Sequence, residues 1–397
     1  MLTVREKCRL CAGAMGRIFR EFPALPVAGA YVRPNADPGA DPLFPLTLLE
    51  CAECGHVQLR ESMKGDFYAQ YRFATGASGG YRVHLETVAD RLQALGLAPE
   101  GQTARVLEIG ASDGELLELL AGRGFKVAGF EPAMEPARQA RRRGLEVVND
   151  FFDTRTARQS PLDRADAVVI RHVLEHIDDF EPIFAGIERI ATPETVLMVE
   201  VPDLAETCRQ RIYGNIYHIH PNYFHAGSLG ALLARYGWGV ERMDSVPVFG
   251  GSLLAMARRS APRRGGRCPD APGMESFVEE WGEYLRQTRD FFDVQKKAGR
   301  RVAGYGAAER TVSLLSTAGV DRTHVSAIYD ANRHLEGLAL PGSRIPVRPP
   351  ARLEADQPDL LAIFARSFEE EIVEQQQGFR KAGGQFVSLR SAAPRLI

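Results

Sequence analysis

The sequence predicts an α/β protein with a Rossmann-like core, a small metal-binding domain before it and a second Rossmann-like α/β domain after it. Three observations predict this layout. Two Cys-x-x-Cys pairs lie near the N-terminus, a strand–glycine turn–helix–strand pattern covers 104–132, and a similar pattern returns over 300–330. Because 397 residues are too many for one ordinary core, we expect domains at residues 1–70, 71–260 and 274–397.

Composition and charge exclude several classes of protein. Hydrophobic residues make up 45% and charged residues 25%, which is typical of a globular chain. The formal net charge of -2 argues against a nucleic-acid binder, which usually carries a basic excess. No apolar run reaches the ~20 residues of a membrane span, and "MLTVREKCRL" lacks the apolar stretch of a signal peptide. We therefore expect a cytoplasmic protein without a disulfide framework.

The first domain is predicted to hold zinc. "CRLC" contributes Cys8 and Cys11, and "CAEC" contributes Cys51 and Cys54. Each Cys-x-x-Cys turn points two thiolates at one metal ion, and two such turns complete a tetrahedron. Four thiolates leave no open position, so the predicted role is structural; a redox pair is the disfavoured alternative. The remaining nearby candidates are expected to be ordinary surface or packing residues: His56, Cys208 and Cys268.

The core begins with a pattern that suits a nucleoside-containing ligand. "RVLEIG" and "KVAGFEP" are predicted strands, and "GELLELLAGRG" between them is a predicted helix. The turn Glu108-x-Gly110-x-x-Asp113-Gly114 lacks the full G-x-G-x-x-G, which disfavours pyrophosphate binding. Gly110 would let the backbone approach the ligand, and Glu131 could accept hydrogen bonds from two ribose hydroxyls. The alternatives are a plain tight turn and a helix-start acid.

This pattern resembles class I S-adenosylmethionine-dependent methyltransferases. "NDFF" stands where that family contacts adenine, and "DAVVIRHVLEHIDD" matches a strand followed by the family's post-strand turn and helix. The resemblance implies S-adenosylmethionine as the methyl donor. The residues it implies for the donor site are Glu108, Gly110, Asp113, Gly114, Glu131, Pro132, Asp150, Phe151, Phe152, Arg171 and His172.

The last third reads as a linker followed by a second α/β unit. "APRRGGRCPDAPG" is rich in Pro, Arg and Gly, and "ESFVEEWGEYLRQTRDFFDVQKKAG" after it predicts a long helix. Strand, glycine turn and helix then follow in "RRVAGYGAAERTVSLLSTAG", with further strands in "VSAIYDAN", "PDLLAIFA" and "GGQFVSL". A weak structural repeat of the core is expected, without a complete second cofactor motif.

The order of zinc ribbon, methyltransferase core and this tail is similar to nucleotide-sugar C-methyltransferases of deoxysugar biosynthesis. The resemblance covers nearly the whole chain, including "GYGAAERTVSLLSTAG", "YDANRHLEG" and "PGSRIPV". It implies methylation of carbon 3 of a nucleoside-diphosphate 4-keto-6-deoxysugar, so that a nucleotide sugar is the expected partner. It also implies that the ribbon and the tail help to form the sugar-nucleotide site. A monomer is expected from the three-part layout.

The stretch "GNIYHIHPNYFH" is either a proton-handling site or a solvated loop over a core strand. The family motif at this place is approximately Ile-Tyr-His-Glu-His. Tyr217 and His220 keep it, so the resemblance implies His220 as general base and Tyr217 as its polar partner. His176 of "LEHIDD" matches a family histidine near the donor methyl, and Tyr71 of "YRFATG" is a further candidate catalytic residue.

Three positions depart from the family pattern. Ile219 replaces its Glu, Phe73 its second Tyr, and Arg310 a residue that is more often Lys. These departures leave open a different sugar, a different ring position, or methylation of oxygen or nitrogen. An RNA methyltransferase and a non-catalytic relative are less favoured, because of the near-neutral charge and the intact donor motif.

The aromatic and histidine residues also have purely structural interpretations. His218 and His225 are expected at the surface or in supporting positions. His172 could cap the donor pocket or start a helix, His220 could be a structural histidine, and Tyr71 could serve packing alone.

Overall fold

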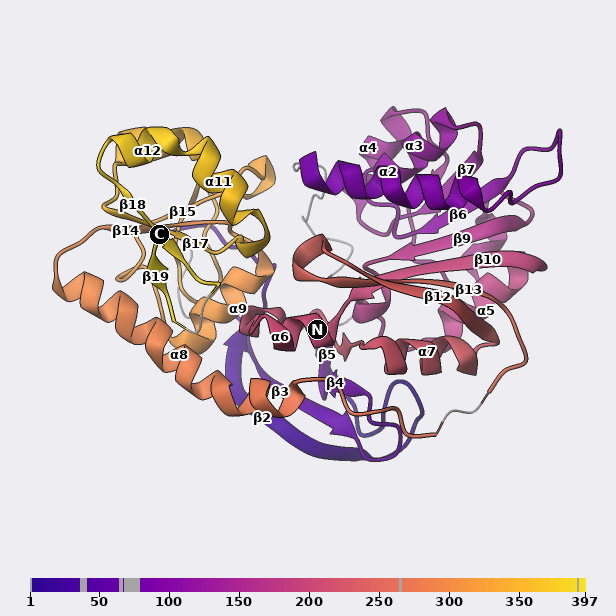
Figure 1. Ribbon diagram of the computed structural model, residues 1–397, viewed down its shortest axis with the longest axis horizontal. Coiled ribbons are helices and arrows are strands. Elements are labelled where there is room, and N and C mark those ends of the chain that lie inside the picture. The colour runs from indigo at the N-terminus through magenta and orange to yellow at the C-terminus, as the bar shows by residue number, and fades with distance from the viewer. Residues whose placement is uncertain (1, 36–40, 64–66, 68–78, 264–265, 391–392) are drawn as a thin grey trace.

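The computed structural model describes residues 2–35, 41–63, 67, 79–263, 266–390 and 393–397. Figure 1 shows two α/β units on either side of a smaller β-rich segment, to which the N-terminal residues belong. Among the described residues, no helix has the length and apolar character that crossing a membrane requires.

The central unit is a seven-stranded sheet of order β12-β13-β10-β9-β6-β7-β8. The five neighbouring strands β8, β7, β6, β9 and β10 pair in parallel, whereas β13 runs antiparallel to both of its neighbours. The strands are β6 (Arg105–Ile109), β7 (Lys126–Phe130), β8 (Val147–Val148), β9 (Ala165–Arg171), β10 (Ala191–Pro202), β12 (Trp238–Val246) and β13 (Ser252–Arg259). This order is doubly wound, with its switch point between β6 and β9.

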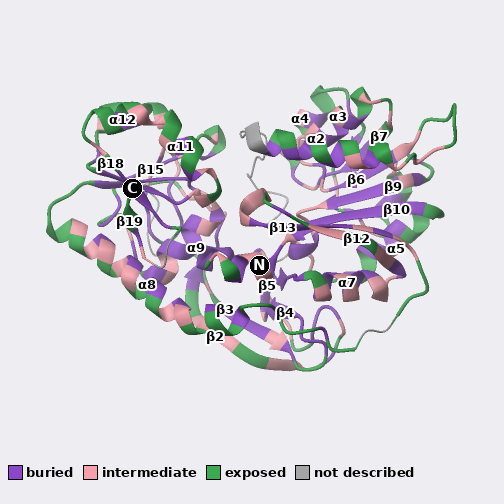
Figure 2. Ribbon diagram, in the orientation of Figure 1, coloured by how far each residue is buried: buried purple, intermediate pink, exposed green. Residues whose placement is uncertain are grey.

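Helices cover both faces of this sheet, as the buried strands and half-exposed helices in Figure 2 show. They are α2 (Gly79–Ala94), α3 (Glu115–Gly122), α4 (Met134–Arg142), α5 (Glu181–Ile190) and α7 (Ala226–Arg235). Alternation within β9 divides the core: Val169 packs with α2 and α3, whereas Val168 and Ile170 pack with α5 and α7. The predicted strands and helix of "RVLEIG", "GELLELLAGRG" and "KVAGFEP" are confirmed.

The tail repeats the order of the first five strands of the central unit. Its six-stranded sheet has the order β16-β15-β14-β17-β18-β19, parallel except for the last pair. The strands are β14 (Val302–Tyr305), β15 (Ile328–Tyr329), β16 (Val347–Arg348), β17 (Leu360–Ile363), β18 (Gln385–Ser388) and β19 (Arg395–Leu396). The helices are α8 (Met274–Lys297), α9 (Glu309–Ala318), α10 (Leu353–Asp356), α11 (Glu369–Gln375) and α12 (Gln377–Lys381). The expected repeat therefore exists at the level of topology.

The N-terminal segment forms an antiparallel sheet of order β11-β4-β3-β2, with β1 and β5 paired beside it. Its strands are β1 (Leu2–Val4), β2 (Met15–Pro26), β3 (Leu43–Cys51), β4 (Val57–Leu59) and β5 (Glu61–Met63), joined by β11 (Asn222–Tyr223). Because β11 follows α6 (Leu204–Arg209) and the 3-10 turn η4 (Tyr213–Asn215), the "GNIYHIHPNYFH" stretch is held between this sheet and the core.

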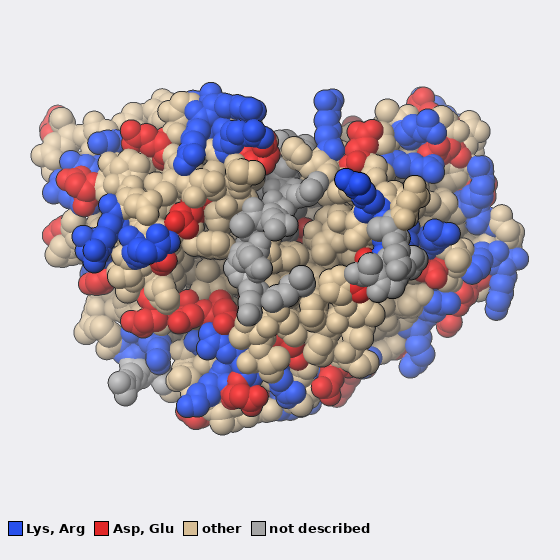
Figure 3. Space-filling view, turned by 180° about the vertical axis from the view of Figure 1, so that it is seen from behind, with Lys and Arg blue, Asp and Glu red and all other residues tan. Residues whose placement is uncertain are grey.

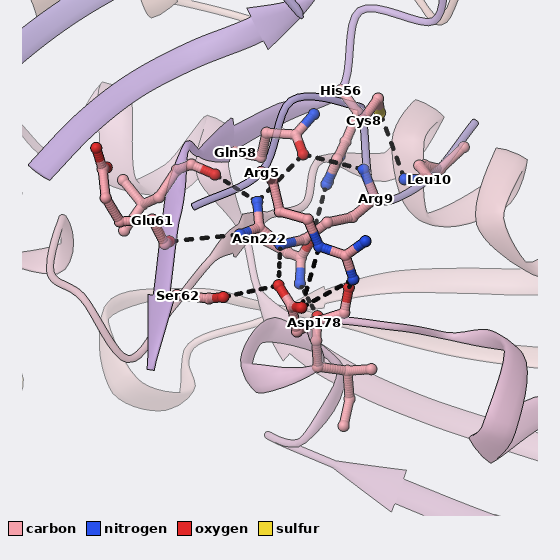
Figure 4. Close-up of polar contacts among 12 residues, drawn as sticks. Arg5, Cys8, Arg9, Leu10, His56, Gln58, Glu61, Ser62, Asp178 and Asn222 are labelled. Carbon is pink, nitrogen blue, oxygen red and sulfur yellow. Dashed lines mark hydrogen bonds and ion pairs between the residues drawn. The ribbon is translucent and has the colours of Figure 1, made fainter. Parts of the chain in front are cut away.

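The three parts are held together by aromatic packing and by buried charge. Trp281 of α8 lies 5.5 Å from Phe22 of β2 and 5.6 Å from Tyr213, measured between ring centroids. Arg9 donates to Asp178 at 2.9 Å, and Ser62 donates to the same carboxylate at 2.7 Å (Figure 4). Because the Arg9 side chain is fully buried, loss of Asp178 would leave an unpaired charge between the N-terminal sheet and the core.

Charges of both signs are interspersed over the face shown in Figure 3. The formal net charge of the chain is -2. Neither observation points to the continuous basic surface of a nucleic-acid binder.

Candidate active site

A cavity of about 860 Å³ lies between the central unit and the tail. On one side, its wall follows the carboxyl ends of β6, β7 and β9. On the other side, the wall comes from the start of α9 and from the segment after β17. Ligands of doubly wound sheets bind at such carboxyl ends, near the switch point. The cavity therefore joins the ligand-binding edges of both sheets.

The turn after β6 leaves no room for a side chain at Gly110. Gly110 has φ 78°, and a Cβ there would meet a Val173 methyl carbon at 2.3 Å. Its amide and that of Ala111 both donate to the Phe130 carbonyl, at 2.8 and 2.9 Å. Gly114, with φ 85°, precedes α3 and packs against Leu145, away from the cavity wall. The lack of a side chain at Gly110 thus lets the backbone of this turn lie close to Val173, and Gly114 shapes the turn just before α3.

Glu131 presents a fixed carboxylate to the cavity. Its Oε2 accepts from the Ser112 amide at 2.9 Å and its Oε1 accepts from the Ala133 amide at 2.7 Å. Burial raises the pKa of Glu131 to about 7, although these two amides oppose the shift. Each oxygen keeps a further lone pair, so the carboxylate can accept two vicinal hydroxyl groups. These residues therefore fit the ribose of S-adenosylmethionine.

The other residues predicted for the S-adenosylmethionine site either line the cavity or lie outside its wall. Asp113, Pro132, Phe151 and Phe152 line the cavity. Asp113 also accepts from Arg143 at 3.2 Å. Asp150 lies outside the wall, where it accepts from Arg155 at 3.2 Å and caps the Phe151 amide.

A buried ion pair lies beneath the turn that contains Gly110. Glu108 is fully buried and receives a hydrogen bond from Arg171 at 2.9 Å. Arg171 also donates to the Tyr81 hydroxyl at 2.9 Å and reaches the cavity wall. Glu108 does not line the cavity, so the structure places it behind the residue that does.

His172 follows β9 with φ 53° and lines the cavity. Its ring nitrogens lie 3.4 Å from Glu175 and 3.5 Å from Glu200. Burial disfavours the imidazolium, but these carboxylates more than offset it and raise the pKa of His172 to about 9. His172 is therefore a charged wall residue that stands just before the 3-10 turn η3 (Leu174–His176).

His220, Tyr217 and His176 meet at the other end of the cavity. The Tyr217 hydroxyl lies 3.0 Å from His220 Nε2, and the rings of His176 and His220 are 4.6 Å apart. His176 Nδ1 contacts the Ile219 carbonyl at 2.6 Å. Because a carbonyl only accepts, this contact assigns the proton to Nδ1 of His176.

Burial sets the protonation states of this group. It lowers the pKa of His220 well below its usual range, and His176 and Arg310 act in the same direction. Burial also raises the pKa of Tyr217 well above its usual range. At neutral pH, His220 is therefore an uncharged base and Tyr217 keeps its proton.

The "GNIYHIHPNYFH" stretch is buried, so the alternative of a solvated loop is wrong. His218 and His225 were expected at the surface or in supporting positions; they are 1% and 3% exposed, which excludes the surface and leaves the supporting positions. His218 Nε2 contacts the Phe44 and Pro45 carbonyls, and the His225 side chain caps α7. Ile219 is fully buried within the core shared by β3, α8 and the tail.

Sequence reasoning missed several wall residues. Glu175 precedes His176 in "LEHIDD", and the sequence pattern indicated a role for His176 but none for Glu175. The tail contributes Arg310, noted before only as a departure, and residues without any sequence signal: Tyr284, Phe364 and Arg366. Tyr71 lies outside the described residues.

The four predicted metal ligands cluster in the N-terminal segment. The sulfur atoms of Cys8 and Cys54 are 3.7 Å apart, and those of Cys11 and Cys51 are 3.4 Å apart. Four Zn–S bonds of about 2.3 Å place tetrahedral sulfur atoms about 3.8 Å from one another. Backbone amides point at three of the sulfurs, for example Leu10 at Cys8 and Gly13 at Cys11. The set fits structural zinc.

Family models match the chain in three consecutive segments. A zinc-binding domain model matches residues 8–66, a methyltransferase domain model matches 81–242, and a C-methyltransferase C-terminal domain model matches 267–389. The C-methyltransferase NovU of Streptomyces niveus is 28% identical over 410 residues, covering 99% of this chain and 97% of NovU. The chain is an S-adenosylmethionine-dependent methyltransferase, and it is similar to a C-methyltransferase over nearly its whole length.

The two solved structures that follow are similar to less than half of this methyltransferase. Magnesium protoporphyrin IX methyltransferase of Synechocystis PCC 6803, with bound S-adenosylmethionine, is 18% identical, with a TM-score of 0.34, over 46% of this chain and 80% of its own. A methyltransferase of Archaeoglobus fulgidus is 19% identical, with a TM-score of 0.36, over 44% and 94%.

Proposed function

We propose that this methyltransferase methylates the carbon beside the keto group of a nucleotide-linked 4-keto-deoxysugar, with His220 as general base. The observation that carries the proposal is the Tyr217–His220 pair, 3.0 Å apart, in the same cavity as the Glu131 carboxylate. The cavity volume of about 860 Å³ accommodates a donor and a nucleotide sugar together.

Glu131 would accept the ribose hydroxyls of the donor, and Gly110 would let the backbone approach it. Phe151 and Phe152 would flank the adenine, with Asp113, Pro132 and His172 completing the wall. Bound S-adenosylmethionine supplies a methyl group on a positively charged sulfur, which is electrophilic.

At the acceptor end, Tyr217 and His220 would act in turn. Without substrate, the Tyr217 hydroxyl would donate to His220 Nε2, with the His220 proton on Nδ1. A substrate carbonyl oxygen would take over that hydrogen bond, which frees Nε2 to accept the proton from the neighbouring carbon. The carbon–hydrogen electron pair then becomes the enolate, whose oxygen Tyr217 stabilises. His176, fixed by the Ile219 carbonyl, would support the base through its ring contact.

Ile219 favours a second candidate function. An apolar residue at the position of the family Glu removes a carboxylate that could hold a sugar hydroxyl or orient a histidine. O- or N-methylation of a sugar or related small molecule needs a base but no ketone, and is therefore the alternative.

The test incubates the purified protein with S-adenosylmethionine and a panel of nucleotide 4-keto-6-deoxysugars in deuterated water. Mass spectrometry reports methyl gain, and proton NMR reports loss of the signal at the carbon beside the ketone. Carbon methylation with exchange that depends on His220 supports the proposal. Methylation of hydroxyl or amine acceptors, with no exchange on any ketosugar, supports the alternative.

A further inference from the structure

A group of buried charges lies directly behind the cavity, and its carboxylates are unequally satisfied. Glu108 has Arg171 at 2.9 Å, and Glu200 has His84 at 2.9 Å. Among the described residues, the ion-pair partner of Glu175 is His172, at the longer distance of 3.4 Å. Its Oε2 is buried and has no hydrogen-bond partner in the described part of the chain, as is also true of one oxygen each of Glu108 and Glu200. By the distance to its partner, Glu175 is the least compensated carboxylate of this group.

Glu175 lies against the two histidines of the acceptor end. One ligand-type atom each of Glu175, His176 and His220 lie within 4.8 Å of one another. The Glu175 side chain is only 2% exposed and contributes to the cavity wall. At this depth, a negative charge is weakly screened and acts strongly on neighbouring charges.

We propose that Glu175 is the positioning carboxylate of the base, whose buried charge stabilises the imidazolium that forms when His220 takes a proton from the acceptor. This inference rests on the proposed function. An imidazolium in this largely enclosed site needs a counter-charge, and the buried apolar side chain of Ile219 supplies none. Glu175 acts through the histidines and needs no contact with substrate.

The titratable groups around His176 and His220 determine whether loss of the Glu175 charge raises or lowers the proton affinity of these histidines. Those described that face His220 or His176 are Tyr217, His172, Arg310 and Glu175, and Glu309 lies near Tyr217. His172 and Arg310 both disfavour a second positive charge, whereas Glu175 favours one. Removing the Glu175 charge should therefore make the histidine pair less basic.

The test compares Glu175→Gln with the unchanged protein by NMR of histidine labelled with ¹³C at Cε1, without acceptor. His176→Asn and His220→Asn assign the signals. We expect the titration midpoints of His176 and His220 to fall by about one unit, a tenfold loss of proton affinity. Where a panel sugar turns over, kcat should fall about tenfold and its acidic limb should move to lower pH.

Glu61→Gln is the matched control, since Glu61 is a buried carboxylate of the N-terminal sheet that accepts from the Thr47 amide and hydroxyl. It should lower stability without moving either midpoint. Unmoved midpoints in Glu175→Gln would overturn the inference, even if His220→Asn abolishes deuterium exchange and so upholds the proposed function. A second metal ion per chain that Glu175→Gln removes would also overturn it, in favour of a metal site at these three residues.

Discussion

The hydroxyl of Tyr217 lies 3.0 Å from Nε2 of His220, and both side chains line the cavity that also holds Glu131. The two residues are three apart in the chain and lie in the turn that leads into β11. Their ring centroids are 4.4 Å apart. This pairing joins a base that burial keeps uncharged to a hydroxyl that burial keeps protonated, which is the combination that enolisation requires.

His220→Asn removes the base while keeping a polar side chain of similar shape. We expect kcat to fall by about 10²–10⁴-fold, the range for losing a general base. Affinity for S-adenosylhomocysteine, measured by calorimetry, should stay within about twofold, because in the proposed function Glu131 and Gly110, not His220, would hold the donor. Retained turnover would remove His220 from the mechanism.

Tyr217→Phe removes only the hydroxyl. We expect kcat to fall by about 10²-fold, as for loss of one oxyanion donor, with KM little changed. Tyr236→Phe is the control, since Tyr236 stacks on Phe184 with ring centroids 4.2 Å apart and does not line the cavity. Equal effects of both substitutions on kcat would indicate a general loss of stability instead.

Glu131→Gln should weaken binding of S-adenosylhomocysteine by about 10- to 100-fold, since hydrogen bonds to a charged group contribute about 1.5–3 kcal/mol. The pKa of Glu131 is raised to about 7 by burial, so the carboxylate gains a proton as pH falls through that value. Donor affinity of the unchanged protein should therefore decrease from pH 8 to pH 6.

The Gln variant carries no proton to titrate at residue 131, so its affinity should stay level over the same range. Glu135→Gln on α4 is the matched control, because Glu135 is an acidic residue of the next helix that pairs with Arg138 at the surface. If the affinity for S-adenosylhomocysteine depended on pH in the same way in Glu131→Gln and in the unchanged protein, the proposed contact of Glu131 with the donor ribose would be contradicted.

Much of the donor site could be predicted because its residues lie within short, regular segments. The strand, turn and helix around Gly110 follow from local hydrophobic periodicity, and Glu131 follows from its place at the end of the next strand. The Tyr217–His220 pair could be named because both residues belong to one motif of the family that the chain resembles. Local patterns therefore carried the prediction of the turn, and the resemblance carried the prediction of the pair.

The remaining features depend on contacts between distant segments. His218 was expected at the surface or in a supporting position, and only the structure shows that its partners are the carbonyls of Phe44 and Pro45, more than 170 positions away. Arg366 reaches the cavity only because the tail faces the core across it. Nothing in the local pattern around Glu175 indicates that its neighbours would leave one oxygen without a partner.

Cys51→Ser should release zinc and lower the thermal stability of the protein, because structural zinc contributes directly to folding free energy. Metal analysis should give one zinc per chain before the substitution and substantially less after it. Cys208→Ser is the control, since that buried thiol contacts the Met274 sulfur and lies outside the cluster. An unchanged zinc content in Cys51→Ser would refute the four-cysteine site.

His172 should make stability decrease at alkaline pH. Its pKa is raised from 6.5 to about 9, so the folded state holds a proton that the unfolded chain releases. The resulting stabilisation is complete below pH 6.5 and is lost as pH rises through 9, with an upper limit of about 3 kcal/mol. Urea unfolding at pH 7 and pH 9.5 measures it. Other groups titrate in the same range, so the decrease is compared with that of His172→Gln, which should be smaller. An equal decrease in both proteins would show that the contacts of His172 with Glu175 and Glu200 leave its proton affinity unchanged on folding.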